Sequence, residues 1–121
     1  MTENAGGQIS PKFFKHEYYK KVVYDWLAKK GITPAYEFPK HTSEGADVAA
    51  ITDHDTFDAY EITLHFSNLA DNITKCQRLK ANKIFIVCEN QAQITIAEQK
   101  AKKALGSIPD QTAFIKITEF F

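Results

Sequence analysis

Hydrophobic residues recur at four-residue intervals in the first quarter of the chain, a spacing typical of one face of a helix. They form two neighbouring rows: Phe14, Tyr18, Val22 and Trp26 in one, and Tyr19, Val23 and Leu27 in the other. Ser10 supplies a capping hydroxyl, Pro11 fits the first helical position, and Gly31 supplies a left-handed residue at the end. The pattern predicts a helix from about Pro11 to Lys30 that docks an apolar stripe on a sheet. We expect residues 1–10 to form a flexible polar segment.

Three segments with the pattern of extended chain follow this helix. Ala35–Pro39 is short and ends in proline, which favours an edge strand. Asp47–Ile51 and Ala59–Phe66 are separated by the turn-rich residues 52–58, as in a β-hairpin. The second of these strands alternates strictly, with Tyr60, Ile62, Leu64 and Phe66 on one face and Glu61, Thr63 and His65 on the other. That alternation predicts a half-buried strand.

The remainder of the chain predicts a helix, a strand, a second helix and a second strand. In order, these elements are Asn68–Ala81, Lys83–Cys88, Gln91–Leu105 and Ala113–Ile117. Ser67 is placed to cap the first of them, and Gly106 ends the second helix. The segment before Gln91 is continuously apolar from Ile84, which indicates a strand covered on both faces. We expect it to be the central strand of the sheet.

The 121 residues, 44% of them hydrophobic, suffice for one domain, which we place at residues 11–121. We expect either a small standalone protein or an excised domain. The sequence has no apolar run near the ~20 residues that a membrane span needs, and residues 1–8 lack the pattern of a secretory signal. A cytoplasmic protein without a membrane partner is therefore expected. Cys76 and Cys88 lie in apolar runs without metal-ligand spacing, so we expect two buried free thiols.

Charge is balanced, since 15 Lys and Arg residues oppose 15 Asp and Glu residues. A surface that binds polyanions everywhere is therefore excluded, and any affinity for nucleic acid depends on local patches. Two groups of basic residues stand out: Lys12, Lys15, Lys20, Lys21, Lys29 and Lys30 in the first helix, and Lys75, Arg78, Lys80 and Lys83 after the hairpin. Each group also has a simpler interpretation as a solvated helix face.

Two acidic residues occupy neighbouring strands of the predicted hairpin, Asp47 in the first and Glu61 in the second. Carboxylates that converge from adjacent strands can hold a hard divalent cation. Taken singly, each has an ordinary structural explanation, because an Asp at a strand start often forms a turn or cap and a Glu on an exposed strand face is common. The combination of the pair with the order of elements makes this a candidate site.

The order of elements is helix, three strands, helix, strand, helix and strand, an α/β arrangement in which a hairpin sheet is extended by right-handed crossovers. With Asp47 opening the second strand and Glu61 in the third, the chain resembles the PD-(D/E)XK nuclease superfamily of restriction enzymes and Holliday junction resolvases. The resemblance spans Lys12 to Ile117. It implies a restriction-endonuclease-like αβββαβ core with a mixed sheet flanked by helices, plus an additional C-terminal helix and strand. The run Glu61–Cys76 is similar to nuclease-like domains attached to mobile-element and conjugation-type ATPases.

The resemblance implies a site for Mg²⁺ or Mn²⁺ and a set of residues around it. Asp47 and Glu61 would be metal ligands, with the backbone carbonyl of Ile62 as a third oxygen. Glu17, in the first helix, matches in kind an acidic residue that some resolvase-like members use. Asn72 is a further accessory candidate. His65 is the one histidine of the four that we expect to approach the site, because it follows Glu61 on the same strand face.

Thr63 departs from the superfamily pattern, because it occupies the position where such a nuclease carries its lysine. A hydroxyl cannot place a positive charge beside the scissile phosphate. Lys75 lies two turns into the following helix, on the same polar side as Asn68 and Asn72, and its long side chain can compensate by reaching back to the strand. The sequence thus predicts a catalytic set of Asp47, Glu61 and a displaced lysine, Lys75.

Three functions remain open. The first is a Mg²⁺-dependent DNA endonuclease or resolvase-like phosphodiesterase. The second is a catalytically degenerate module with the same fold, which binds DNA or docks on a partner ATPase or another mobile-element protein; Thr63 and the zero net charge favour it. The third and weakest is a ligand-binding or regulatory α/β domain, since no Gly-rich nucleotide loop follows any strand. Resolvase-type work on symmetric junctions would call for a homodimer.

Overall fold

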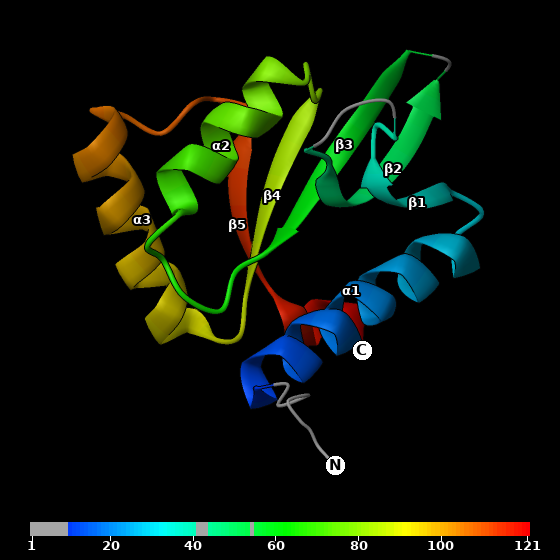
Figure 1. The fold of residues 1–121 in the computed structure, drawn as a ribbon, viewed down its shortest axis with the longest axis horizontal. Helices are drawn as coiled ribbons and strands as arrows, with labels where there is room; N and C mark the ends of the chain where they lie inside the picture. The colour runs from blue at the N-terminus through cyan, green and yellow to red at the C-terminus, as the bar shows by residue number, and fades with distance from the viewer. Residues whose placement is uncertain (1–9, 41–43, 54) are drawn as a thin grey trace.

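The computed structural model describes residues 10–40, 44–53 and 55–121 (Figure 1). The elements are α1 (Pro11–Lys29), β1 (Thr33–Phe38), β2 (Ala46–Asp53), β3 (Thr56–Ile62), α2 (Leu69–Arg78), β4 (Lys83–Cys88), α3 (Gln91–Leu105), β5 (Thr112–Lys116) and the 3₁₀ turn η1 (Ile117–Phe120). This order confirms the α/β prediction, including the additional C-terminal helix and strand. The flexible segment predicted for residues 1–10 lies, except for Ser10, outside the described residues.

Over the described residues, the sheet has five strands in the order β1-β2-β3-β4-β5. β1, β2 and β3 pair antiparallel, whereas β4 and β5 run parallel to β3, so the sheet is mixed as predicted. β1 is an edge strand, as Pro39 suggested. The prediction that Lys83–Cys88 is the central strand is wrong: β3 holds that place, and β4 is the interior strand beside it. Helices cover both faces of the sheet at β3 and at β4. A continuous apolar run therefore cannot tell the central strand from the interior strand beside it.

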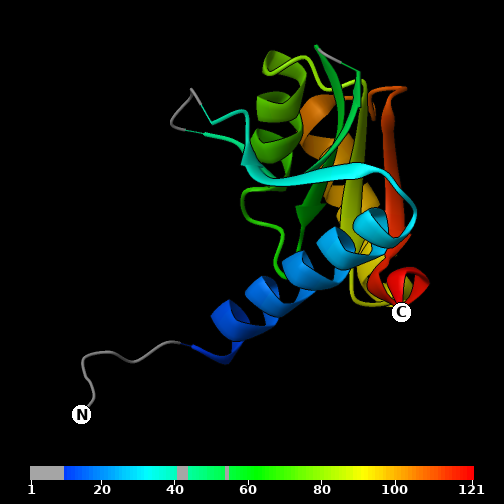
Figure 2. The same ribbon diagram turned by 90° about the vertical axis from the view of Figure 1, so that its right-hand side faces the viewer.

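Two apolar layers hold the helices against the sheet. Val23 and Leu27 of α1 pack with Val48 and Tyr60 on one face. Residues of α2 and α3, including Ile73 and Ala97, pack on the other face (Figures 1 and 2). The sheet lies between these layers. At the end of β3, α1 therefore approaches from one side and α2 from the other.

α1 begins where the sequence predicts, with the Ser10 hydroxyl accepting a hydrogen bond from the Phe13 amide at 3.1 Å. The predicted docking row is only half correct. Val22 and Trp26 pack against the core, but Phe14 and Tyr18 are 59% and 58% exposed. Figure 2 shows that the first turns of α1 extend past the sheet, so this part of the helix has one side turned away from the core. Helical periodicity identifies a face but not how far the neighbouring sheet extends.

The boundaries around the hairpin and α2 differ from the predictions. β2 and β3 extend into the predicted seven-residue connection, pairing as far as Asp53 and Thr56. β3 ends at Ile62 rather than Phe66, and both of its faces are buried there, so it is not the half-exposed strand that the alternation predicted.

The residues between β3 and α2 turn away from the sheet. The hydroxyl of Ser67 pairs with His65 at 3.4 Å instead of capping the helix. α2 starts after Asn68 and ends at Arg78, just before Lys80 adopts a φ of 66°. A positive φ at a residue other than glycine interrupts a right-handed helix, which explains the early end. Residues 63–68 therefore form a loop beside the end of β3.

Within the described residues, none of the helices combines the length and apolar composition needed to cross a membrane. The remaining predicted elements, α3 with its end at Gly106 and the strand after it, are confirmed within one residue.

Both cysteines are buried free thiols, as predicted. Burial raises the pKa of the Cys76 thiol to about 12 and that of Cys88 to about 11. We therefore expect neither thiol to react with Ellman's reagent at about pH 8 in the native protein, because the thiolate is the nucleophile. Absorbance of the released thiolate should show two equivalents only after denaturation. Rapid reaction of the native protein would contradict the packing described for α2 and β4.

Candidate functional site

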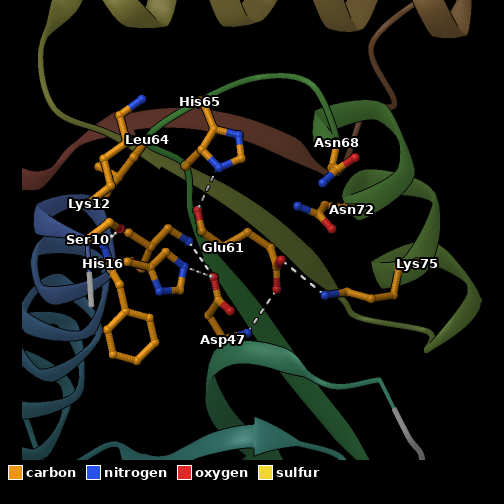
Figure 3. Close-up of a pocket in the computed structure, with 13 residues that line it drawn as sticks. Ser10, Lys12, His16, Asp47, Glu61, Leu64, His65, Asn68, Asn72 and Lys75 are labelled. Atoms are coloured by element: carbon orange, nitrogen blue, oxygen red, sulfur yellow. Dashed lines mark hydrogen bonds and ion pairs between the residues drawn. The ribbon is translucent and has the colours of Figure 1, made fainter. Parts of the chain in front are cut away.

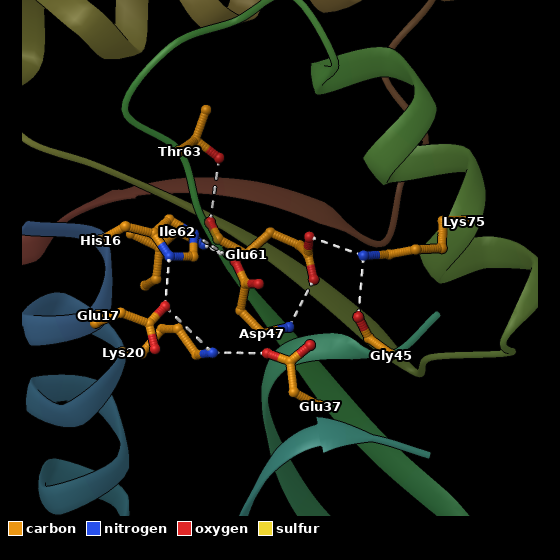
Figure 4. Close-up of polar contacts among 10 residues, drawn as sticks. All are labelled: His16, Glu17, Lys20, Glu37, Gly45, Asp47, Glu61, Ile62, Thr63 and Lys75. Atoms are coloured by element: carbon orange, nitrogen blue, oxygen red, sulfur yellow. Dashed lines mark hydrogen bonds and ion pairs between the residues drawn. The ribbon is translucent and has the colours of Figure 1, made fainter. Parts of the chain in front are cut away.

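The backbone ladder between β2 and β3 stops at the pair Val48 and Tyr60. Beyond it, two carboxylates take over the hydrogen bonds. Glu61 Oε2 accepts a bond from the amide of Asp47 at 2.9 Å, and Asp47 Oδ2 accepts one from the amide of Ile62 at 2.9 Å (Figure 4). Each acidic side chain thus holds the backbone of the opposite strand. The predicted pair converges, and the strands separate at this point.

A pocket of about 460 Å³ opens beside the separated strands (Figure 3). Asp47, Glu61 and Ile62 line it from the sheet. α1 and its cap, the loop after β3, and α2 supply the other walls: Ser10, Lys12, Phe13, His16, Thr63, Leu64, His65, Asn68, Asn72 and Lys75. Most residues singled out from the sequence, including Asn72 and His65, therefore face one cavity.

Lys75 reaches the site from α2, as predicted. Its Nζ donates hydrogen bonds to Glu61 Oε1 at 3.1 Å and to the carbonyl oxygen of Gly45 at 3.0 Å (Figure 4). Thr63, in the position expected for a lysine, is buried, and its hydroxyl donates to the carbonyl of Glu61 at 3.2 Å. The ammonium group beside the acidic pair is therefore delivered by the helix rather than by the strand.

Glu61 is 2% exposed, and this burial dominates its electrostatics. Desolvation, with the nearby charge of Asp47 as the next cause, raises the pKa of Glu61 to about 7, although Lys75 and the Asp47 amide oppose the shift. Burial also opposes the charge of Lys75, but the carboxylate of Glu61 outweighs it and raises the pKa of Lys75. The lysine therefore stays cationic, while Glu61 titrates near neutrality.

His16, like Phe13, is a site residue that sequence reasoning missed. His65 also lines the pocket, but the expectation that it is the one histidine to approach the site is wrong. The Nε2 atom of His16 lies 3.3 Å from Asp47 Oδ2, and its Nδ1 lies 3.2 Å from Glu17 Oε2. The hydrogen bond with Asp47 is the main cause that raises the pKa of His16. A signal was present in the four-residue spacing of Lys12, His16 and Lys20, a polar row that lies on the inner side of a helix whose outer side is aromatic.

Glu17 approaches the acidic pair only through its neighbours. Besides His16, its carboxylate lies 3.6 Å from Lys20 Nζ, and Lys20 is in turn bound to Glu37 at 2.6 Å. This chain of charges connects α1 to the end of β1 (Figure 4). The amide of Ile62 binds Asp47, but the role predicted for the Ile62 carbonyl as a metal ligand stays a prediction. Of the other histidines, His41 and His54 lie outside the described residues.

Within residues 10–40, 44–53 and 55–121, no group of three or more His, Cys, Asp or Glu side chains is arranged to hold a metal ion. The acidic donors at the pocket are therefore two carboxylates, Asp47 and Glu61. Two carboxylates fit Mg²⁺, because this ion usually keeps several waters and takes one or two protein carboxylates plus substrate phosphate.

Comparison with models of known protein families finds no match, and comparison with curated proteins finds none either. The interpretation of the site therefore depends on its own geometry.

Gly45 is the point where the β1 end, the acidic pair and Lys75 meet. A Cβ atom at this position would lie 2.5 Å from the carbonyl carbon of Glu37 and 2.6 Å from its oxygen. Glu37 itself has a φ of 48°, so this part of the backbone is already constrained. Only glycine allows the two segments to approach closely enough to present the Gly45 carbonyl to Lys75.

We expect Gly45→Ala to lower the free energy of unfolding by about 1–3 kcal/mol, the usual cost of overpacking, and to shift the side-chain NMR signal of Lys75. Gly106→Ala is the matched control, because its added Cβ would meet no atom within 4 Å and only its φ of +84° is unfavourable. The control should lose stability while the Lys75 signal stays in place. An unshifted Lys75 signal in Gly45→Ala would contradict the contact.

The raised pKa of Glu61 makes stability depend on pH. Since its folded-state pKa of about 7 exceeds the ordinary 4.5, its contribution to folding is fully present below pH 4.5 and is lost as pH rises through 7. Glu61→Gln removes the titratable group and keeps one acceptor oxygen, which can accept the bond from the Asp47 amide. We expect the stability of this variant relative to the wild type to rise by up to about 3 kcal/mol between about pH 4.5 and pH 8.

Urea unfolding at several pH values, in buffer with a chelator, measures this difference. A relative stability of the Gln variant that falls over this pH range would show that the charged pair of Glu61 and Lys75 stabilises the fold.

Proposed function

We propose that the protein is a metal-dependent phosphodiesterase that acts on DNA, of the PD-(D/E)XK type, with its lysine moved from the third strand to α2. One observation carries the proposal: Lys75 Nζ lies 3.1 Å from Glu61 Oε1 in the pocket that Asp47 also lines. An acidic pair and a cation in one polar cavity are what hydrolysis of a phosphodiester requires. The element order and mixed sheet support the same class.

Asp47 and Glu61 would hold the metal ion. A Mg²⁺ or Mn²⁺ ion bound there would polarise a phosphoryl oxygen and lower the pKa of a bound water. Both side chains are anchored through one carboxylate oxygen to a backbone amide of the opposite strand, which fixes their positions. The separated ends of β2 and β3 therefore present the carboxylates to the pocket as a preorganised pair.

Lys75 provides the positive charge at the reacting phosphate. It stays cationic because Glu61 raises its pKa, and its bond to the Gly45 carbonyl holds the ammonium at the pocket wall. In this position it can neutralise charge on a phosphate. His16 orients Asp47 from the opposite wall, since its ring bridges that carboxylate and Glu17. The four side chains thus enclose the phosphate position from four elements, α1, β2, β3 and α2.

A second candidate is a non-catalytic module with the same fold, which binds DNA or docks on a partner ATPase. The observation that favours it is the pairing of the carboxylates with protein donors: both oxygens of Glu61 and Oδ2 of Asp47 accept bonds from the chain itself. In that case the pair would serve to close the sheet, and the pocket would bind without cleaving.

Incubation of supercoiled, linear and branched DNA with Mg²⁺ or Mn²⁺ separates the two candidates. We expect metal-dependent cleavage by the wild type, and a loss of about 10²–10³-fold in Asp47→Asn, Glu61→Gln and Lys75→Met, the usual cost of removing a group that stabilises the transition state. Lys100→Met, which removes a lysine from α3 outside the pocket, is the control and should cleave normally.

Binding without metal-dependent cleavage on every substrate would overturn the enzymatic proposal and leave the binding module. Lys75→Met with wild-type activity would overturn the role of the displaced lysine.

A further inference from the structure

An exposed aromatic ring, that of Phe13, stands at the entrance of the pocket on the first turn of α1. Phe13 lines the pocket and is also 51% exposed, so its ring borders both the cavity and solvent. Phe14 packs edge-on against it, with ring centroids 6.2 Å apart, and Tyr18 is exposed one turn later. Because these turns run past the sheet (Figure 2), the rings contribute nothing to the core. An exposed apolar surface beside a site often marks a binding surface, and an aromatic ring there can stack on a planar group of a ligand.

Cations are interspersed among these rings. Lys12 lines the pocket next to Phe13, and Lys75 faces them across it. Lys15 lies on the following turn, where it pairs with Glu89 at 3.0 Å. Hydrophobic interfaces between proteins are depleted of lysine at their centres. The ring of Phe13 in one pocket with the ammonium groups of Lys12 and Lys75 therefore fits a polyanion with flat bases better than the apolar surface of a protein or a second copy of this chain.

Across the cavity from α1, the wall is polar (Figure 3). The amides of Asn68, the N-cap of α2, and of Asn72 within α2 face the cavity, and His65 also lines it. A nucleotide that enters between these walls would meet an aromatic face on one side and hydrogen-bonding groups on the other. Its phosphate would meet Lys12 and Lys75. These are the two components of single-strand binding sites, a stacking surface and a cationic groove.

We propose that the substrate is single-stranded nucleic acid, or an unpaired stretch within a longer molecule, and that Phe13 stacks on the base beside the reacting phosphate. The inference rests on the proposed function, because it names the substrate class of that same site. The physical reason is that both faces of a base in a duplex are covered by its neighbours. A ring at the pocket entrance can stack only on a base that has left the duplex. Phe13 is thus a specificity-determining residue.

Binding in the presence of EDTA tests this inference without requiring cleavage. The probe is a fluorescein-labelled oligothymidylate of about 15 nucleotides, within the usual site size, compared by anisotropy with a duplex of equal length. We expect the single strand to bind more tightly than the duplex. Phe13→Ala should weaken single-strand binding by about tenfold, Phe13→Trp should retain it, and duplex binding should change little in both. Phe121→Ala is the control, because Phe121 is 73% exposed but lies outside the pocket lining.

Stacking has its own spectroscopic signature. An oligonucleotide with a central 2-aminopurine should lose fluorescence on binding to the wild type and to Phe13→Trp, and should keep it on binding to Phe13→Ala. Equal binding of single strand and duplex, or wild-type affinity and quenching in Phe13→Ala, would overturn the inference. So would sedimentation that shows a dimer which Phe13→Ala and Phe14→Ala convert to monomer, because the rings would then belong to an interface between copies.

The two proposals fail in different ways. Absence of cleavage together with binding that depends on Phe13 overturns the enzymatic function and leaves the single-strand surface. If the protein cleaves DNA but Phe13→Ala does not change its preference between single strand and duplex, the proposed substrate class is overturned and the enzymatic function stands.

Discussion

The exchange of hydrogen bonds between two carboxylates and two backbone amides is the interaction on which the site depends. At the point where β2 and β3 separate, Asp47 and Glu61 replace the ladder that the strands no longer form. A buried backbone amide without a partner would cost about 1–3 kcal/mol, so the separation is possible only because the side chains supply acceptors. The same bonds bring two negative charges together in a buried place. Lys75 and His16 each place a basic side chain beside these carboxylates, and the constrained Gly45 offers its carbonyl oxygen to Lys75.

Glu61 shows how such an arrangement can serve a reaction at the expense of the fold. Its burial raises its pKa, so at neutral pH the protein either keeps a proton there or bears the cost of an ionised buried group. A residue whose only task were to close the sheet could be an amide. Retention of an ionisable group at a buried position, next to a second carboxylate and a lysine, is characteristic of sites at which charge is used. The fold therefore tolerates a buried ionisable carboxyl group at Glu61, and the proposed chemistry needs that group.

Much of this molecule could be predicted from its sequence, because the signals concerned are local. Ser10, Gly31 and Gly106 mark helix ends through their own caps and dihedral angles, and these predictions are confirmed. The approach of Lys75 to Glu61 followed from helical spacing and the length of a lysine side chain. Predictions failed where the outcome depends on distant parts of the chain. The exposure of Phe14 and the central place of β3 depend on how far the sheet extends and in what order it assembles. His16 was missed for the same reason, since its partner Asp47 lies on another element.

β3 joins two kinds of sheet, because it pairs antiparallel with β2 and parallel with β4. Asp47 and Glu61 come together when the hairpin on one side of this seam closes, a local event that needs only a short turn. Lys75 reaches Glu61 when the crossover on the other side packs α2 against the sheet, although it lies 14 residues from Glu61, the same separation as Asp47. The hairpin alone would hold two adjacent carboxylates without their counter-ion. Completion of the parallel half therefore neutralises a repulsion that the antiparallel half creates, and this makes the site an electrostatic link between the two halves of the fold.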